Sequence, residues 1–273
     1  MKPFTEIIML GSGEATVTRC YNTCFILRTD RSTILVDGGG GNGILCQLEK
    51  AQIPLTEISS IFLTHSHSDH IMGVVWVLRM LGEYANSDVV QSRKIHIVSN
   101  RETLESLIFI CRCTLSSRVL NRLMSLVEYI EVADGQTVDI VPDLRFNVFD
   151  TGTLDTMQTG FQTMLPNGET LVCLGDAQCT ENIAKSFRGV DWMLCEAFCL
   201  DKDKDRFHPH KFHHNTVIES ARIASRMKVK NLVLYHTEDT DLDNRKQSYT
   251  KEAATYFNGS IYVPDDLEKI LIY

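Results

Sequence analysis

The sequence predicts an α/β fold made of two similar halves, each a β-sheet that carries helices on its outer face. Short runs of β-branched and aromatic residues bounded by turn residues indicate strands, and longer apolar runs indicate helices. This order of strands followed by a helix occurs once in the first half and again in the second. No linker or low-complexity tract divides the 273 residues, so we expect one domain over residues 1–273.

The predicted strands of the first half are short apolar runs that end at turn signals, at residues 7–10, 23–27, 33–37, 61–63 and 129–132. The glycine run Gly38–Gly41 cannot continue a strand and predicts a tight loop. Helical segments are expected at residues 43–50, 71–80 and 102–126. In the second half we expect strands at residues 144–149, 160–165, 170–174, 192–195 and 231–235, and a helix at 216–227.

The segment Thr64–His70 places four metal-ligand side chains within six residues, in the order His65-x-His67-x-Asp69-His70. It lies between a predicted strand and a predicted helix, where irregular backbone can surround an ion. Imidazole nitrogens and carboxylate oxygens are ligands for zinc and its first-row neighbours. The segment therefore predicts a metal site.

This motif resembles that of the metallo-β-lactamase superfamily, whose fold is a four-layer αββα sandwich. The resemblance implies that His65 and His67 bind one metal and that Asp69 and His70 bind a second. The oxygen-reducing diiron branch of the superfamily usually has Glu at the position of His67, so this chain resembles the hydrolytic branch. The expected cofactor is a pair of divalent ions, with zinc favoured and manganese or iron as alternatives.

Two strands of the second half end in further ligand residues. Leu171–Leu174 is followed by Gly175-Asp176, and Leu232–Tyr235 is followed by His236. By resemblance, Asp176 bridges the two metals and His236 is the last ligand of metal two. Asp37 corresponds to an Asp that supports a ligating histidine from outside the coordination shell.

One position departs from the pattern of the family, which normally supplies a third histidine for metal one before the bridging Asp. No histidine occurs between His96 and His208. Asp155 or Asp150 can stand in as a carboxylate ligand. Alternatively, water fills this position or metal one is weakly held.

Two more features resemble the ribonuclease Z-like branch. Glu196 ends a predicted buried strand, and His214-Asn215-Thr216 opens a predicted helix. In that branch an acid and a histidine at these places flank the metals and assist proton transfer. The long arm with which tRNA-processing members grip their substrate is missing, because the corresponding region, residues 179–190, is short.

The resemblance therefore implies a dinuclear phosphodiesterase acting on a small nucleotide, such as a cyclic nucleotide, or on a short nucleic acid. Two divalent ions would bind opposite oxygens of the phosphodiester and generate hydroxide from water near neutral pH. Asp69 would orient or deprotonate that water. His214, held by Glu196, would donate a proton to the leaving oxygen.

Composition narrows the possible partners. The formal net charge of −8 argues against a broad nonspecific nucleic-acid surface. No apolar run reaches membrane-spanning length, so no membrane partner is expected. Nine cysteines without a Cys-x-x-Cys pair, and no apparent signal peptide, favour free thiols in the reducing cytoplasm. Cys195 and Cys199 are expected to be packing residues. A homodimer is a further expectation, since relatives often form one.

Three alternative functions remain at this stage. A tRNA 3′-processing endoribonuclease would share the catalytic centre. A thioester or lactone hydrolase would share the metal core but would not need Glu196 and His214. A catalytically silent metal-binding or nucleic-acid-binding module would explain the missing third histidine.

Overall fold

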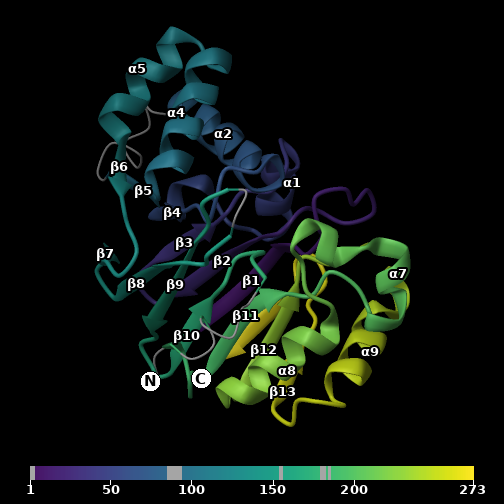
Figure 1. Ribbon diagram of the computed structural model, residues 1–273. Helices are drawn as coiled ribbons and strands as arrows, with labels where there is room; N and C mark the ends of the chain where they lie inside the picture. Colours follow the sequence, from purple (N-terminus) through teal and green to yellow (C-terminus); the bar gives the residue numbers. More distant parts are fainter. Residues whose placement is uncertain (1–3, 85–93, 154–155, 179–182, 184–185) are drawn as a thin grey trace.

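The computed structural model describes residues 4–84, 94–153, 156–178, 183 and 186–273 (Figure 1). It contains two seven-stranded sheets that pack face to face. Helices cover the outer face of each sheet, which produces four layers in the order αββα. The predicted architecture is therefore confirmed.

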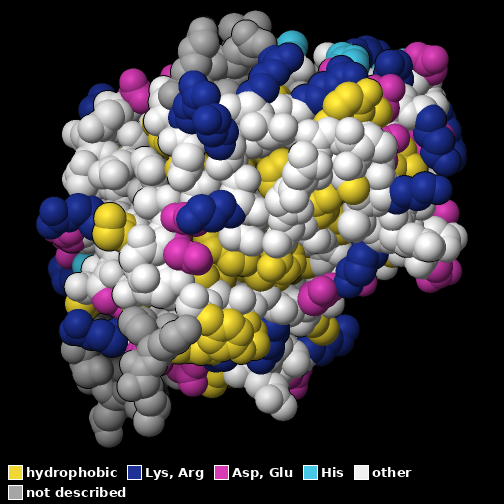
Figure 2. All heavy atoms as spheres, turned by 90° about the horizontal axis from the view of Figure 1, so that it is seen from below, with side chains coloured by type: hydrophobic (Ala, Val, Ile, Leu, Met, Phe, Trp, Pro, Cys, Tyr) yellow, Lys and Arg dark blue, Asp and Glu magenta, His cyan; other side chains and the backbone are white. Residues whose placement is uncertain are grey.

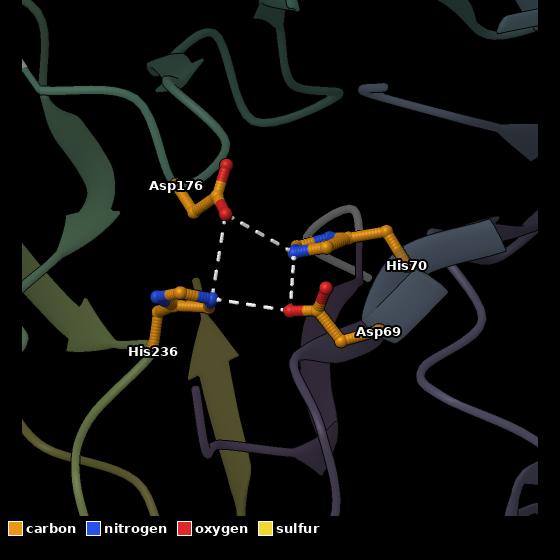
Figure 3. A group of neighbouring side chains, drawn as sticks. All are labelled: Asp69, His70, Asp176 and His236. Carbon is orange, nitrogen blue, oxygen red and sulfur yellow. Dashed lines mark ion pairs between the residues drawn. The ribbon is translucent and has the colours of Figure 1, made fainter. Parts of the chain in front are cut away.

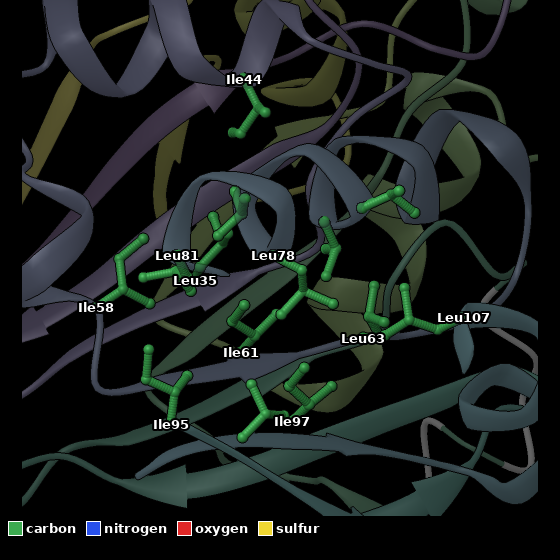
Figure 4. Close-up of a cluster of buried hydrophobic side chains, with 14 of the residues drawn as sticks. Leu35, Ile44, Ile58, Ile61, Leu63, Leu78, Leu81, Ile95, Ile97 and Leu107 are labelled. Carbon is green, nitrogen blue, oxygen red and sulfur yellow. The ribbon is translucent and has the colours of Figure 1, made fainter. Parts of the chain in front are cut away.

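The first sheet has the strand order β14-β1-β2-β3-β4-β5-β6. Its strands are β1 (Thr5–Gly11), β2 (Cys24–Thr29), β3 (Thr33–Val36), β4 (Ser60–Phe62), β5 (Ile95–Ser99), β6 (Val127–Glu131) and β14 (Lys269–Ile272). Its outer face is covered by α1 (Gly43–Lys50), α2 (Ser68–Glu83), α4 (Arg101–Thr114) and α5 (Ser117–Leu126). Figure 4 shows Leu78 and Leu81 of α2 among the apolar side chains of this layer, near Ile61 of β4 and Ile97 of β5.

The second sheet has the order β13-β12-β11-β10-β9-β8-β7. Its strands are β7 (Thr137–Val141), β8 (Leu144–Asp150), β9 (Thr159–Met164), β10 (Thr170–Cys173), β11 (Trp192–Glu196), β12 (Asn231–Tyr235) and β13 (Ser260–Tyr262). Its outer face carries α8 (Val217–Met227) and α9 (Leu242–Ala253), and the short α7 (Lys204–Phe207) lies in the connection between β11 and α8.

The core between the sheets follows from the alternation of side chains along each strand. In β1, Ile7 and Met9 point toward the other sheet, whereas Ile8 and Leu10 point toward the helices. Both faces of the strand are thus buried, which explains why residues 7–10 are continuously apolar rather than alternating. Phe62 of the first sheet meets Phe161 of the second edge-on, with ring centroids 4.9 Å apart, and so joins the two sheets.

Each strand and helix predicted from the sequence is present, with shifts of a few residues at their ends. The helical segment 102–126 is two helices, because Ser116 interrupts it and its side chain caps the start of α5. Six further helices and strands of the described residues were not predicted: β5, β7, α7, α9, β13 and β14.

Cys195 and Cys199 are buried, as expected of packing residues. Within the part of the chain that the structure describes, no helix is both long enough and apolar enough to cross a membrane.

Candidate metal centre

The predicted site residues come together because parallel strands end at the same edge of each sheet. Strands β3 and β4 run parallel in the first sheet, and β10, β11 and β12 run parallel in the second. The backbone turns sharply just beyond three of these ends, with positive φ angles at Asp37 (56°), Gly175 (65°) and His236 (56°). A positive φ is strained for a residue other than glycine, so the fold holds Asp37 and His236 in sparsely populated conformations.

The His-x-His-x-Asp-His motif spans the loop after β4 and the first turn of α2. His67 occupies the N-cap position of α2, and Asp69 and His70 lie in the first turn of that helix. His65, Asp69 and His70 are buried, whereas His67 is exposed. The carboxylate at the helix N-terminus also benefits from the positive end of the helix dipole.

One group of four side chains, Asp69, His70, Asp176 and His236, surrounds a common point (Figure 3). His70 Nε2 lies 3.2 Å from Asp69 Oδ2 and 3.3 Å from Asp176 Oδ2. His236 Nε2 lies 3.5 Å from Asp69 Oδ2 and 3.4 Å from Asp176 Oδ2. Two carboxylate oxygens and two imidazole nitrogens thus converge from α2, from the end of β10 and from the end of β12.

A second group consists of His65, His67 and Asp176. Here the other oxygen of the same carboxylate takes part, because Asp176 Oδ1 lies 3.6 Å from His65 Nε2. Asp176 therefore presents Oδ1 to one group and Oδ2 to the other. This is the arrangement that a bridging carboxylate requires.

Hydrogen bonds at Nδ1 orient the rings of His65 and His70. Asp37 accepts from the Thr64 hydroxyl and backbone N–H, both at 2.8 Å, and its Oδ2 lies 2.8 Å from His70 Nδ1. The Thr64 hydroxyl lies 2.9 Å from His65 Nδ1. If Nδ1 of both rings carries the proton, Nε2 of each ring keeps a lone pair.

Among the described residues, the opposite ring nitrogens have carboxylate neighbours but no hydrogen-bond partner. His65 Nε2, His70 Nε2 and His236 Nε2 are buried without a hydrogen bond, and all three point into the two groups. A buried, unpaired polar atom costs about 1–3 kcal/mol. A bound divalent ion would provide the missing partner, so the residues present fit a metal centre.

The electrostatics of the centre also suit a cation. Burial lowers the pKa of His65 to about 4, so its ring is neutral at pH 7. Burial opposes ionisation of Asp176, but His65 and His70 outweigh this effect and hold the pKa of that carboxyl well below its usual range. For His70, burial is outweighed by nearby carboxylates, chiefly Asp69 and Asp176, which raise the pKa of the ring well above its ordinary value. The negative charge that stabilises a proton there would equally stabilise a metal ion.

Glu196 and His214 lie beside His236 of the four-residue group. Glu196, fully buried at the end of β11, accepts from the Asn215 backbone at 2.9 Å, and its Oε2 lies 2.5 Å from His214 Nδ1. His214 stacks on Phe198, with ring centroids 5.0 Å apart. Burial would lower the pKa of His214, but the Glu196 carboxylate outweighs it and raises that pKa to about 9. Glu196, His214 and His236 also form a third group with possible metal-ligand spacing.

The two carboxylates considered for the missing third histidine have different outcomes. Asp150 is exposed and accepts a hydrogen bond from the Gly152 backbone at 2.8 Å. None of the three groups found among the described residues contains Asp150. Asp155 lies outside the described residues. Near Asp176 Oδ1 the structure instead places Gln158, which the sequence did not indicate because glutamine is an uncommon metal ligand.

A cavity opens from the centre to solvent. Its lining residues come from four segments and are His67, Thr153, Thr156, Gln158, Asp176, Phe212, His213 and His214. Its volume is about 60 Å³. Small-molecule sites usually have roughly 300–1,000 Å³, so this cavity is well below that range.

Comparisons with known proteins agree with this geometry. The model of the family described as Anti-Pycsar protein Apyc1 matches residues 5–256. A protein of that name from Bacillus phage BSP38 is 35% identical over 104 residues, which is 38% of either chain. Ribonuclease Z from Mycolicibacterium gilvum is 25% identical over 284 residues and covers 98% of this chain and 96% of its own length.

Among solved structures, the metallo-β-lactamase fold protein YhfI from Bacillus subtilis superposes with a TM-score of 0.75 at 17% identity, over 99% of this chain and 100% of its own. The predicted metallo-β-lactamase fold and the resemblance to ribonuclease Z are thereby confirmed. Together these relatives support a metal-dependent hydrolase as the general class of protein.

Proposed function

The chain belongs to the Anti-Pycsar protein Apyc1 family, and from that premise we propose that it is a metal-dependent phosphodiesterase whose substrate is a small nucleotide, such as a cyclic nucleotide. The observation that carries the proposal is the single Asp176 carboxylate shared between two groups of histidines, with the Glu196–His214 pair beside it. A shared carboxylate suits a pair of ions, and the adjacent acid–histidine pair suits proton transfer to a leaving group.

Divalent ions bound by His65, His67, Asp69, His70, Asp176 and His236 would polarise the phosphoryl oxygens and acidify water. The protein's own groups would then position and move protons. Asp69, held beside His70 and His236, would orient the attacking water or accept its proton. His214 lines the cavity, and its Nδ1 is engaged by Glu196, so Nε2 is the atom that would donate a proton to the leaving oxygen.

Four features favour a small substrate over a long polyanion. The cavity is small, and the formal net charge is −8. The connection between β10 and β11, residues 174–191, is too short in sequence to contain a long substrate-gripping arm. On the face seen in Figure 2, Lys and Arg side chains alternate with Asp and Glu and form no broad basic field.

We therefore expect the metal-loaded protein to hydrolyse a small chromogenic phosphodiester and a cyclic nucleotide, but to process precursor tRNA poorly. A thioester should be a poorer substrate than the phosphodiester, because a thiolate leaves without a proton and gains nothing from the Glu196–His214 pair. Parallel assays of the four substrates at physiological salt would check this. Site-specific trimming of a tRNA 3′ trailer would favour the endoribonuclease alternative, and faster thioester than phosphodiester turnover would favour the thioesterase alternative.

Phe212 is the residue of the cavity best suited to contact a nucleobase. It is 57% exposed and lines the cavity beside His214. Stacking of a base on an aromatic ring contributes about 1–3 kcal/mol. Phe212→Ala should therefore raise KM for a cyclic nucleotide by roughly 5- to 150-fold and leave KM for methyl 4-nitrophenyl phosphate, which has no base, nearly unchanged.

The matched control for this prediction is Phe109→Ala. Phe109 is 68% exposed on α4 and does not line the cavity. Steady-state kinetics of both variants on both substrates would check the assignment. An equal rise in KM for the two substrates would show that Phe212 does not recognise the base.

A further inference from the structure

Gln158 has an environment that packing alone does not explain. It lies just before β9, and its side chain is 5% exposed. Its Nε2 donates to Asp176 Oδ1 at 2.6 Å, whereas its Oε1 is buried without a hydrogen-bond partner. Asp176 Oδ1 is the oxygen that faces His65 and hence the group of His65, His67 and Asp176.

The backbone around Gln158 is held on both sides. The Gln158 carbonyl accepts from the backbone N–H of Thr151 at 3.0 Å. Asn100 donates to the carbonyl of Met157 at 3.1 Å and to the hydroxyl of Thr159 at 2.9 Å. The Thr159 N–H donates to the carbonyl of Thr64, the residue before His65. These bonds hold the backbone on both sides of Gln158 against the loop that carries His65 and His67.

The side-chain amide of Gln158 has the chemistry of the ligand that the group of His65, His67 and Asp176 lacks. Among the described His, Cys, Asp and Glu side chains, only His65, His67 and Asp176 offer atoms to it. An amide oxygen is a legitimate ligand for hard divalent ions. Rotation of the amide by 180° exchanges its oxygen and nitrogen while the rest of the side chain stays in place.

We propose that Gln158 is a fourth ligand of the first metal site, which is the group of His65, His67 and Asp176, and that it binds the ion through its amide oxygen in place of the third histidine of related hydrolases. This inference rests on the two-ion site of the proposed function. Because a neutral oxygen replaces an imidazole nitrogen, the first site should favour Zn²⁺ over Mn²⁺ less strongly than a site with three histidines would.

Three substitutions at this position separate a ligand from a hydrogen-bond donor. Gln158→Met keeps the length of the side chain but removes both the oxygen and the N–H. Gln158→Glu keeps an oxygen ligand but cannot donate to Asp176. Gln158→His provides an imidazole. Gln162→Met is the matched control, since Gln162 lies in β9, the strand that Gln158 immediately precedes, and does not line the cavity.

Each metal-free variant would be titrated with Mn²⁺ and with Zn²⁺ by calorimetry, and bound ions counted by elemental analysis after dialysis. Thermal unfolding of each metal-free variant would verify that it folds. The unsubstituted protein and Gln162→Met should bind two ions per chain. Gln158→Met should bind the first-site ion at least tenfold more weakly, in line with the 10- to 100-fold cost of lesser disturbances around metal sites. Gln158→Glu and Gln158→His should retain two ions, and Gln158→His should move the preference of the first site toward Zn²⁺.

Two results would overturn the assignment. If Gln158→Met binds both ions as tightly as the unsubstituted protein, Gln158 is not a ligand. If Gln158→Met and Gln158→Glu both lose the first-site ion, the amide acts as a donor to Asp176 and not as a ligand. Binding of only one ion by the unsubstituted protein would remove the two-ion premise and the proposal with it. The readout uses no substrate, so an absence of phosphodiesterase activity with the expected metal pattern would sink the proposed function alone.

Discussion

Asp176→Ala should release at least one metal ion per chain and reduce phosphodiester hydrolysis to the background rate. Asp176 is the only residue shared by the two ligand groups, and its two oxygens lie within 3.6 Å of His65, His70 and His236. Alanine leaves no oxygen in that position, and the buried histidines would lose the carboxylate that stabilises positive charge beside them. Elemental analysis and a chromogenic phosphodiesterase assay would measure both effects.

Asp150→Ala provides the matched control. The sequence allowed Asp150 as a ligand of metal one, but it is exposed and lies outside the ligand groups of the described residues. This variant should keep two ions and full activity. Full metal content in Asp176→Ala would refute the bridging assignment, and loss of an ion in Asp150→Ala would restore Asp150 as a ligand.

His214→Ala should leave both ions bound and lower turnover by roughly 100- to 10,000-fold for a phosphodiester with a poor leaving group, which is the usual contribution of a general acid. The departing oxygen of such a substrate needs a proton, and His214 lines the cavity with its ring oriented by Glu196. A nitrophenolate leaves with little help, so its ester should lose much less activity. Single-turnover kinetics on substrates with graded leaving groups would show the difference.

Glu196→Gln should show the same pattern more weakly, because it misorients the ring without removing it. His210→Ala is the control: His210 is an exposed histidine of the same connection and pairs with Glu219 at 3.0 Å. Equal losses for good and poor leaving groups would mean that His214 binds substrate. Metal loss from His214→Ala would instead make it a ligand, as the third group of possible ligands allows.

The elements that the sequence predicted are those whose signal is local. Strands β1, β10 and β12 are continuous apolar runs, because both of their faces are buried. Helix α9 has no such signal. Its buried positions are Arg245, Tyr249 and Ala253, and the first of these is charged.

Only the folded chain explains why α9 can bury an arginine. Arg245 donates to the hydroxyls of Ser12 and Thr237 and to the carboxylate of Asp265, which come from three separate segments. Strand β14 is a comparable case. It has only two buried residues, Ile270 and Ile272, and forms by pairing with β1 at the other end of the sequence. Its stability depends on a long-range contact that no local pattern reports.

The sequence by itself predicted the motif from His65 to His70 and the ligand residues at the strand ends. The motif could be recognised because its side chains are only a few residues apart, and a strand–turn–helix segment brings such neighbours together. The sequence also singled out Asp37, Asp176, Glu196, His214 and His236 as residues of the site. The tertiary structure decided which oxygen of Asp176 faces which group, and it placed Asp150 outside those groups. It also brought Gln158 against Asp176. These outcomes depend on how the two sheets pack, because β4 and β9 belong to different sheets and only their packing sets the distance between the first motif and Gln158.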